Sequence, residues 1–194
     1  QLKRNRVSAC YFGEGAMAEG AFHETMNMAQ LWKLPVLFCC ENNGYAMGTA
    51  IERELSDVDL LVLAESYRMP AARADGMDVL ACHAAMGNAV EHIRTRGGPF
   101  FLEFRTYRFR PHSMFDPELY RDKAEVEKWK EHDPIATFTE RCLADGLLTA
   151  GDVAAIEDAA AAEVAEAVAY AEAGTLESVD TLTRDVMTPV GGPS

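Results

Sequence analysis

The chain has 194 residues, enough for one domain with a substantial core, and 48% of them are hydrophobic, as is normal for a globular protein. A formal net charge of −13 argues against a surface that binds nucleic acid or an anionic membrane through charge alone. The segment from Cys142 to Thr183 contains no Lys or Arg. We interpret this segment as the solvated face of a C-terminal helix, with a docking surface for a basic partner as the alternative.

The five cysteines form no CxxC pair, and this scattered, odd-numbered set is typical of a reducing compartment. No apolar run reaches the length of a membrane span, and no signal peptide opens the chain. The sequence therefore predicts a cytoplasmic protein, or a mitochondrial matrix protein in a eukaryote. Because a strand is expected soon after Gln1, we also expect that a natural N-terminal part precedes it.

Strands and helices are expected to alternate up to Arg108. The predicted strands cover residues 7–12, 35–40, 71–74 and 100–107, and the predicted helices cover residues 22–32, 57–67 and 79–93. The continuous apolar run 35–40 is typical of a strand that is buried on both faces of a parallel sheet. This alternation predicts an α/β fold with a doubly wound, mostly parallel sheet.

The pattern changes after Arg108. Residues 109–122 form a polar loop with two prolines, and helices follow it. Asp133 and Pro134 are a suitable cap and first-turn pair, while Thr149 and Asp152 suit a capping box that opens a long helix. We therefore predict an α/β domain over residues 1–122 and a C-terminal helical extension over residues 123–194, packed on the same domain.

The glycine-rich segment Gly13-Glu14-Gly15 follows the first strand and opens a helix, where backbone N–H groups favour anions. One interpretation is a dinucleotide fingerprint, G-x-G-x-x-G/A, with Ala18 in the last position and Glu41 as the ribose-binding acid. Glu14 counts against this interpretation, because its carboxylate would repel a pyrophosphate unless a cation separated them.

The second interpretation supplies that cation. Mg²⁺ takes oxygen ligands and commonly joins one or two protein oxygens to phosphates. Glu14 offers a carboxylate and Asn43 an amide oxygen, both at the carboxyl edge of a parallel sheet, where ligands bind in open α/β folds. The alternative for Asn42-Asn43-Gly44 is an ordinary turn.

The GEG segment is followed, after residues 16–41, by Asn42-Asn43. This pattern resembles the thiamine-diphosphate motif, in which GDG is followed at a similar spacing by a double Asn. The segments AQLWKLPVLFCCENNGYAMGT, ADGMDVL and TYRFRPHSMFDPELYR resemble the α subunits of thiamine-diphosphate-dependent 2-oxo acid dehydrogenases, from about Val7 to about Pro189. Within that family the HSMFDP segment favours the pyruvate branch over the branched-chain and acetoin relatives. The matched part is expected to be the C-terminal portion of such a subunit.

The resemblance implies a set of site residues in the domain 1–122. It assigns Mg²⁺ to the side chains of Glu14 and Asn43 and to the main-chain carbonyl of Tyr45. It assigns the cofactor diphosphate to Gly13, Gly15, Ala16, Arg108 and His112. The same comparison makes His112 a catalytic residue on a mobile loop, where it contacts phosphate and helps to handle the substrate or acyl group. Ser113 matches a serine that is phosphorylated in some mitochondrial relatives.

A local basic cluster supports a phosphate site independently. Arg105, Arg108, Arg110 and His112 lie close together in a strongly acidic chain. Thr106, Arg108 and Arg110 would point to one face if the strand continued. Arg suits phosphate because its planar guanidinium binds bidentately. The alternative is a solvated strand end.

Three residues depart from the family pattern. Glu14 stands where the motif has Asp, which preserves the carboxylate but adds a methylene to a geometrically demanding site. Ala18 replaces a common Asn near the diphosphate, and Pro111 replaces a common Gly before His112, which should stiffen the loop.

The family activity is oxidative decarboxylation of a 2-oxo acid, here pyruvate, with transfer of the acetyl group to the lipoyl domain of the E2 acyltransferase. The resemblance implies an α₂β₂ assembly in which the β subunit supplies the glutamate that activates the cofactor, so this part alone should be inactive. The alternatives are a branched-chain or acetoin relative, a nicotinamide-dinucleotide-binding domain, and a non-catalytic subunit that has lost metal binding through Glu14.

Overall fold

The computed structural model describes residues 6–186, so the first five residues and the last eight of the predicted extension lie outside it. The chain forms two compact units that divide between Arg141 and Cys142. The predicted division at residue 122 and the packing of the extension stay predictions.

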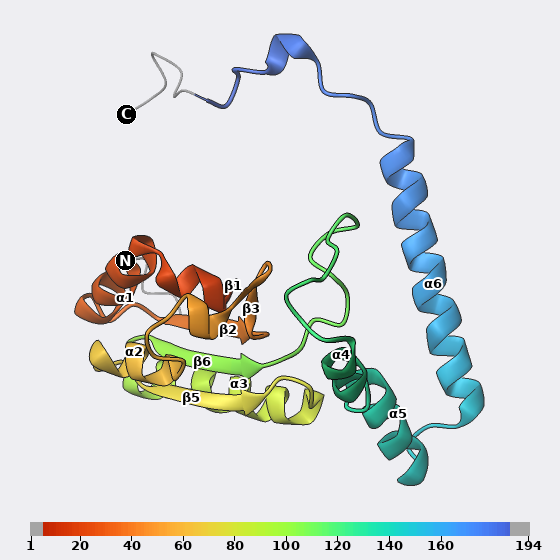
Figure 1. Cartoon of the computed structure of the whole chain (residues 1–194), viewed down its shortest axis with the longest axis horizontal. Helices are drawn as coiled ribbons and strands as arrows, with labels where there is room; N and C mark the ends of the chain where they lie inside the picture. Colours follow the sequence, from red (N-terminus) through yellow and green to blue (C-terminus); the bar gives the residue numbers. More distant parts are fainter. Residues whose placement is uncertain (1–5, 187–194) are drawn as a thin grey trace. The chain divides into compact units, whose positions relative to one another are not determined.

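The first unit is built on a four-stranded parallel sheet with the order β1-β2-β6-β5 (Figure 1). The strands are β1 (Ser8–Gly13), β2 (Val36–Asn42), β5 (Ala71–Asp75) and β6 (Phe100–Arg105). The helices between them are α1 (Gly20–Leu31), α2 (Leu60–Ser66) and α3 (Val79–Arg96), and a short 3₁₀ helix covers Glu14–Ala18. This architecture confirms the predicted α/β class and parallel sheet.

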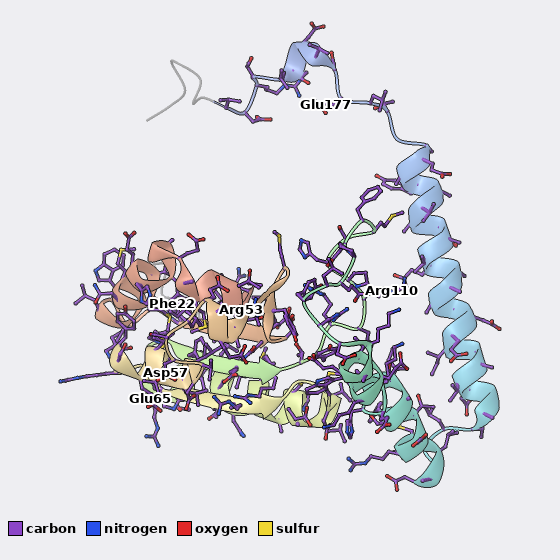
Figure 2. The ribbon with its side chains drawn as sticks, in the orientation of Figure 1. Phe22, Arg53, Asp57, Glu65, Arg110 and Glu177 are labelled. Carbon is purple, nitrogen blue, oxygen red and sulfur yellow. The ribbon has the colours of Figure 1, made fainter. Side chains whose placement is uncertain are left out.

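Helices cover both faces of the sheet. Phe38 and Cys40 of β2 pack in one apolar cluster with residues of α1 and α2, including Phe22, which is labelled in Figure 2. Leu37 and Cys39 pack on the other face with residues of α3. Successive side chains of a strand point to opposite faces, so an unbroken apolar run fills both layers at once. The interpretation of residues 35–40 as a doubly buried strand is confirmed.

The last strand ends earlier than the sequence predicted. Instead of reaching residue 107, β6 ends at Arg105, where the Arg105 carbonyl accepts from the Gly76 N–H (2.8 Å) and the Thr106 N–H donates to the Asn42 carbonyl (2.9 Å). Beyond that point the chain leaves the sheet. The condition for a common face of Thr106, Arg108 and Arg110, a strand that continues, is therefore not met, and Arg110 extends from the following loop (Figure 2).

A small hairpin after β2 was not predicted. It consists of β3 (Tyr45–Ala46) and β4 (Thr49–Ala50), which pair antiparallel, and a 3₁₀ turn, Ile51–Arg53, follows it. Gly44 enters it with a φ of +81°, and Met47 at its tip has a φ of +54°. The carboxyl ends of β1 and β2 lie side by side, since Gly13 is in register with Glu41, so the hairpin rises from the edge where the candidate site lies.

Residues 106–122 contain no helix or strand, which confirms the predicted loop. It leads to α4 (Lys123–Lys130) and α5 (Pro134–Ala144). Asp133 caps α5 by accepting from the Ile135 N–H (2.8 Å) and the Ala136 N–H (3.1 Å).

The main element of the second unit is α6 (Ala150–Glu172), and a short 3₁₀ turn, Val179–Thr181, follows it. Thr149 and Asp152 form the predicted capping box at the start of α6. Among residues 6–186, no helix combines the length and apolar character that crossing a membrane requires.

Candidate metal and phosphate site

The Glu14 carboxylate lies where β1 passes into the 3₁₀ helix, and the residue is only 1% exposed. Its Oε2 accepts two hydrogen bonds from Asn43, one from the backbone N–H (3.2 Å) and one from Nδ2 (3.3 Å). The two residues that the sequence proposed as side-chain metal ligands therefore touch each other at the carboxyl edge of β1 and β2.

Each of these two residues also carries a buried oxygen atom without a partner. Glu14 Oε1 and Asn43 Oδ1 accept no hydrogen bond within the described part of the chain. A buried polar atom left unsatisfied costs about 1–3 kcal/mol, so the arrangement favours a group that would satisfy both oxygens. A hard cation such as Mg²⁺ fits, because it takes carboxylate and amide oxygens.

Burial makes the ionised form of Glu14, which a metal ligand needs, less favourable. Burial raises the pKa of its carboxyl group, and the charge of Glu54 adds to the rise, while backbone N–H groups of Glu14, Asn43 and Tyr45 oppose it. A cation held by this carboxylate would favour the ionised form. Residues 6–186 contain no group of three or more His, Cys, Asp or Glu side chains that could hold a metal. A metal here would thus rely on one carboxylate together with amide and backbone oxygens.

The turn after β2 holds Asn43 in place. Asn42 Oδ1 accepts from the Gly44 N–H (3.0 Å), and the Gly44 carbonyl accepts from the Ile51 N–H (3.0 Å). The φ of Gly44 is one that L side chains rarely adopt, so any other residue there would be strained. The next residue, Tyr45, donates its phenolic hydroxyl to both carboxylate oxygens of Glu125 in α4 (3.2 and 3.0 Å).

The other glycines of the segment differ in what they require. A Cβ atom at Gly15 would lie 2.6 Å from the Cβ of Ala46, closer than two carbon atoms can approach, so only glycine allows the hairpin to pack here. A Cβ atom at Gly13 would meet no atom within 4 Å. Ala16 is exposed on the 3₁₀ helix, where its carbonyl accepts from the Glu19 N–H (3.2 Å).

Arg108, in the loop after β6, contacts the same hairpin. Its Nη2 donates to the Met47 carbonyl (2.7 Å) and to the Tyr120 hydroxyl (3.2 Å), while its Nε is buried without a partner. Met47 is next to Ala46, on which Gly15 packs. The hairpin thus links the glycine segment to a guanidinium group with an unused donor, and an anion would satisfy that donor.

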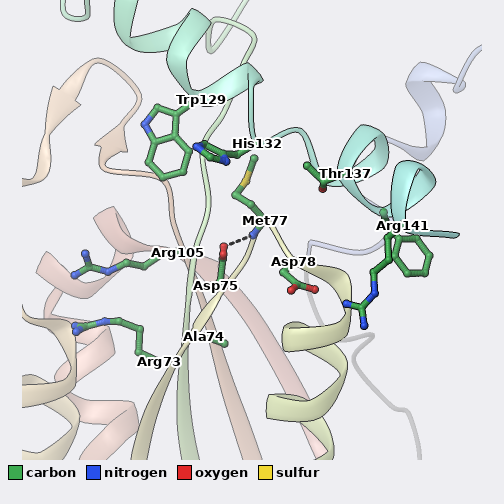
Figure 3. Close-up of a pocket in the computed structure, with 11 residues that line it drawn as sticks. Arg73, Ala74, Asp75, Met77, Asp78, Arg105, Trp129, His132, Thr137 and Arg141 are labelled. Carbon is green, nitrogen blue, oxygen red and sulfur yellow. Dashed lines mark hydrogen bonds between the residues drawn. The ribbon is translucent and has the colours of Figure 1, made fainter. Parts of the chain in front are cut away.

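Two other members of the predicted basic cluster, Arg105 and Arg110, have different surroundings from Arg108. Arg105 turns toward Glu103, whose Oε1 accepts from the Arg105 Nε (3.3 Å). Arg110 is exposed. Arg105 and Arg73 both line a cavity of about 750 Å³ near the ends of β5 and β6 (Figure 3). Arg105 also lines a second pocket, of about 300 Å³, together with Asn43 and Tyr45. A phosphate site that all four of these residues share stays a prediction.

His112 and Ser113 lie exposed on the loop between β6 and α4. The His112 backbone N–H donates to Asp116 Oδ2 (3.0 Å), the Tyr120 hydroxyl donates to the same oxygen (2.7 Å), and the Ser113 carbonyl accepts from the Asp116 N–H (3.2 Å). Within residues 6–186, no hydrogen bond of the His112 imidazole links it to Glu14. Asp116 was missed in the sequence, although Asp before Pro117 is a common turn signal.

Arg121 lies at the end of this loop, and its side chain holds the residues at the start of the loop. Its side chain is 1% exposed, and it donates from Nη1 to the Arg108 carbonyl (2.5 Å) and from Nη2 to the Phe109 carbonyl (3.2 Å). It also pairs with Glu118, and its guanidinium lies over the ring of Tyr107. Nothing in the sequence distinguished this arginine from a solvated one.

Comparison with known proteins decides the family. The family model for the dehydrogenase E1 component matches residues 1–179. The chain belongs to the dehydrogenase E1 component family. It is 42% identical over 184 residues to the pyruvate dehydrogenase E1 component subunit alpha of Rhizobium meliloti (strain 1021), a match that covers 94% of this chain and 53% of that relative.

Two further E1 relatives carry the same name. The protein from Zymomonas mobilis subsp. mobilis is 45% identical over 152 residues, which cover 78% of this chain and 43% of the relative. The protein from Rickettsia prowazekii (strain Madrid E) is 36% identical over 182 residues, which cover 94% of this chain and 56% of the relative. The chain thus spans about half the length of the curated relatives it matches. That this half is the C-terminal one stays a prediction.

Proposed function

We propose that the chain is part of the α subunit of a pyruvate dehydrogenase E1 component, which decarboxylates pyruvate oxidatively and passes the acetyl group to a lipoyl group. The names of its E1 relatives support this function. The observation that carries it is the pair of unpartnered oxygens, Glu14 Oε1 and Asn43 Oδ1, on two residues that bond to each other.

In this proposal the site holds thiamine diphosphate and Mg²⁺. Glu14, Asn43 and the Tyr45 carbonyl would ligate the metal, and Gly13, Gly15, Ala16, Arg108 and His112 would surround the diphosphate. The buried free Nε of Arg108 and the close approach that Gly15 permits support this assignment. The chemistry supplied by bound thiamine diphosphate is nucleophilic addition to the 2-oxo carbon and storage of the electron pair released with CO₂.

The loop that carries His112 would serve the substrate side of the site. Its backbone is held by Asp116 and Arg121, while the His112 side chain stays exposed and free to reach substrate or phosphate. Phosphorylation of the adjacent Ser113 would place negative charge near the proposed diphosphate site, and the repulsion would weaken cofactor binding.

The proposed partners are an E1 β subunit in an α₂β₂ assembly and the lipoyl domain of E2. The β subunit would contribute the glutamate that activates the cofactor, so this chain alone should not turn over. The proposed location is the cytoplasm, or the mitochondrial matrix in a eukaryote. A branched-chain or acetoin dehydrogenase α subunit is the second candidate, because it would use the same metal and diphosphate groups.

The test uses the full-length α subunit co-expressed with its β partner. Reduction of an artificial electron acceptor is followed with pyruvate, branched 2-oxo acids or acetoin, with and without Mg²⁺ and thiamine diphosphate. We expect turnover with pyruvate that needs both additions. Turnover only with another substrate would retain the chemistry and change the substrate. A folded α₂β₂ complex that is inactive with all of them would overturn the proposal and favour a non-catalytic subunit.

A further inference from the structure

A buried carboxylate, that of Glu103, contacts the turn that carries the proposed metal ligands Asn43 and Tyr45. Glu103 is in β6, next to β2 in the sheet, and it is 0% exposed. Its Oε1 accepts from Asn42 Nδ2 (2.8 Å), and its Oε2 accepts from Arg73 Nε (2.6 Å). Neither the sequence motif nor the proposed ligand set includes Glu103.

The bond to Glu103 fixes which way the Asn42 amide points. A carboxylate oxygen of an ionised glutamate only accepts, so Asn42 must turn its Nδ2 donor toward Glu103. The amide oxygen, Oδ1, is then directed to the other side, where it accepts from the Gly44 N–H (3.0 Å). A reversed amide would leave two acceptors facing each other at Glu103 and two donors facing each other at Gly44.

The Asn42 backbone is held by β6 as well, because its carbonyl accepts from the Thr106 N–H (2.9 Å). With both its main chain and its side chain fixed, Asn42 determines where the turn begins. Asn43 follows directly, and its side chain reaches Glu14 (3.3 Å from Nδ2 to Oε2).

Burying a carboxylate is costly unless charges and hydrogen bonds compensate for it. Two guanidinium groups do so here, Arg73 at 2.6 Å and Arg105 at 3.3 Å. Arg73 in turn pairs with Asp59 (2.6 Å). This compensation accounts for how the fold tolerates Glu103. It does not require the bond to Asn42, which links Glu103 directly to the first residue of the turn.

We propose that Glu103 is a positioning residue for the metal site: it orients Asn42, and through the Asn42–Gly44 bond it fixes the turn that carries Asn43 and Tyr45. This inference rests on the proposed function, since it concerns the same metal. Loss of a partner that orients a metal ligand typically weakens metal affinity by about 10–100-fold.

The test compares two variants of the full-length α₂β₂ protein that differ only in the acceptor offered to Asn42. Both carry Arg73→Met and Arg105→Met, which remove the two guanidinium groups that donate to Glu103 and would otherwise compete with Asn42 for a single acceptor oxygen. One adds Glu103→Gln, whose amide oxygen can still accept from Asn42, and the other adds Glu103→Leu, which cannot. Electron paramagnetic resonance of free Mn²⁺ gives the dissociation constant in the presence of thiamine diphosphate, and thermal unfolding reports the loss of stability separately.

We expect the Leu variant to bind Mn²⁺ about 10–100-fold more weakly than the Gln variant. Equal dissociation constants in the two variants would overturn the proposal. Failure of the unaltered protein to bind Mn²⁺ would instead overturn the proposed function, so the two failures are distinct.

A third variant, Asn42→Ala, tests the same link without disturbing the ion pairs of Glu103. It should also weaken Mn²⁺ binding, and adding Arg73→Met, Arg105→Met and Glu103→Leu to it should cause no further loss. Binding by Asn42→Ala that matches the unaltered protein would overturn the proposal, even if the Leu variant does not assemble.

Discussion

Glu14 and Asn43, 29 positions apart in the sequence, are joined by two hydrogen bonds to a single carboxylate oxygen, at 3.2 and 3.3 Å. The other oxygen of Glu14 and the amide oxygen of Asn43 are left without partners. Parallel pairing of β1 and β2 brings the two residues together, since both strands end at the same edge. The arrangement is therefore a consequence of strand register. The metal affinity that we propose for this site depends, in addition, on the negative charge of Glu14.

Glu14→Gln tests that dependence. The Gln side chain can still accept from Asn43, but it lacks the charge that favours a divalent cation. We expect the Mn²⁺ dissociation constant of the α₂β₂ protein to rise by at least about tenfold, equivalent to about 1.4 kcal/mol. Glu14→Asp is the matched control, because it keeps the charge and should lose less. Tighter binding by the Gln variant than by the Asp variant would contradict a metal ligand at this position.

Gly15→Ala should disturb the packing between the glycine segment and the hairpin. The added Cβ would lie 2.6 Å from the Ala46 Cβ. Overpacking of this kind typically costs about 1–3 kcal/mol. Urea unfolding measures the loss of stability, and titration with thiamine diphosphate measures the loss of affinity.

The double variant Gly15→Ala with Ala46→Gly separates a steric clash from other effects. Removing the Ala46 methyl group takes away the atom that the new Cβ would meet, so both stability and affinity should recover in part. Ala46→Gly alone gives the backbone cost of glycine, about 0.5–1 kcal/mol. A double variant as impaired as Gly15→Ala would show that the clash is not the cause.

The sequence was sufficient to predict the features that local periodicity determines. The apolar run 35–40 predicted a doubly buried strand, and both clusters that line the sheet confirm it. The capping box of Thr149 and Asp152 could also be predicted, because its two partners are only three residues apart in the sequence. Within the site, the GEG segment and the double Asn could be paired because parallel strands end at a common edge.

Contacts between distant segments could not be predicted in this way. The hairpin at Tyr45–Ala50 has strands of two residues each, too short for any periodic signal. The end of β6 depends on hydrogen bonds to Gly76 and Asn42 from elsewhere in the chain, so the strand was predicted too long. Arg121 resembles a solvated arginine in the sequence, and only its partners at Arg108 and Phe109 give it a structural role.

Arg121→Met should loosen the loop between β6 and α4. The variant keeps much of the side-chain volume but removes the donors to the Arg108 and Phe109 carbonyls and the pairing with Glu118. Each hydrogen bond to a charged group is worth about 1.5–3 kcal/mol, so a stability loss of that order is expected. Hydrogen exchange measured by mass spectrometry should show faster exchange in residues 109–120.

Lys130→Met is the control for Arg121→Met. It also removes a cation from an ion pair, Lys130–Glu127, but both side chains of that pair are largely solvent-exposed. Exposed pairs contribute little, so its exchange profile should match that of the unaltered protein. An Arg121→Met protein with unchanged exchange in the loop would contradict the anchoring role.

Asp116 gives the same loop a pH dependence. The pKa of its carboxyl group is lowered, chiefly by the Glu118 backbone N–H and the Tyr120 hydroxyl, with smaller contributions from the His112 backbone N–H and the Arg108 charge. A carboxyl group whose pKa is depressed by folding stabilises the fold above its unfolded pKa, about 3.9, and that contribution is lost as the pH falls through the lower folded value. The loop should therefore stay anchored at neutral pH and be released only in acid below about pH 4.

Titration of carbon-13-labelled aspartate carboxyl groups by NMR spectroscopy can measure this pKa. We expect Asp116 to titrate below its ordinary value and Tyr120→Phe to raise its pKa, because the variant removes a donor 2.7 Å from Asp116 Oδ2. Tyr170→Phe, at a tyrosine that is 85% exposed in α6, should leave the pKa unchanged. If Asp116 titrated at its ordinary value, the carboxylate would not be holding the backbone of His112, and the loop would have to be positioned by Arg121 alone.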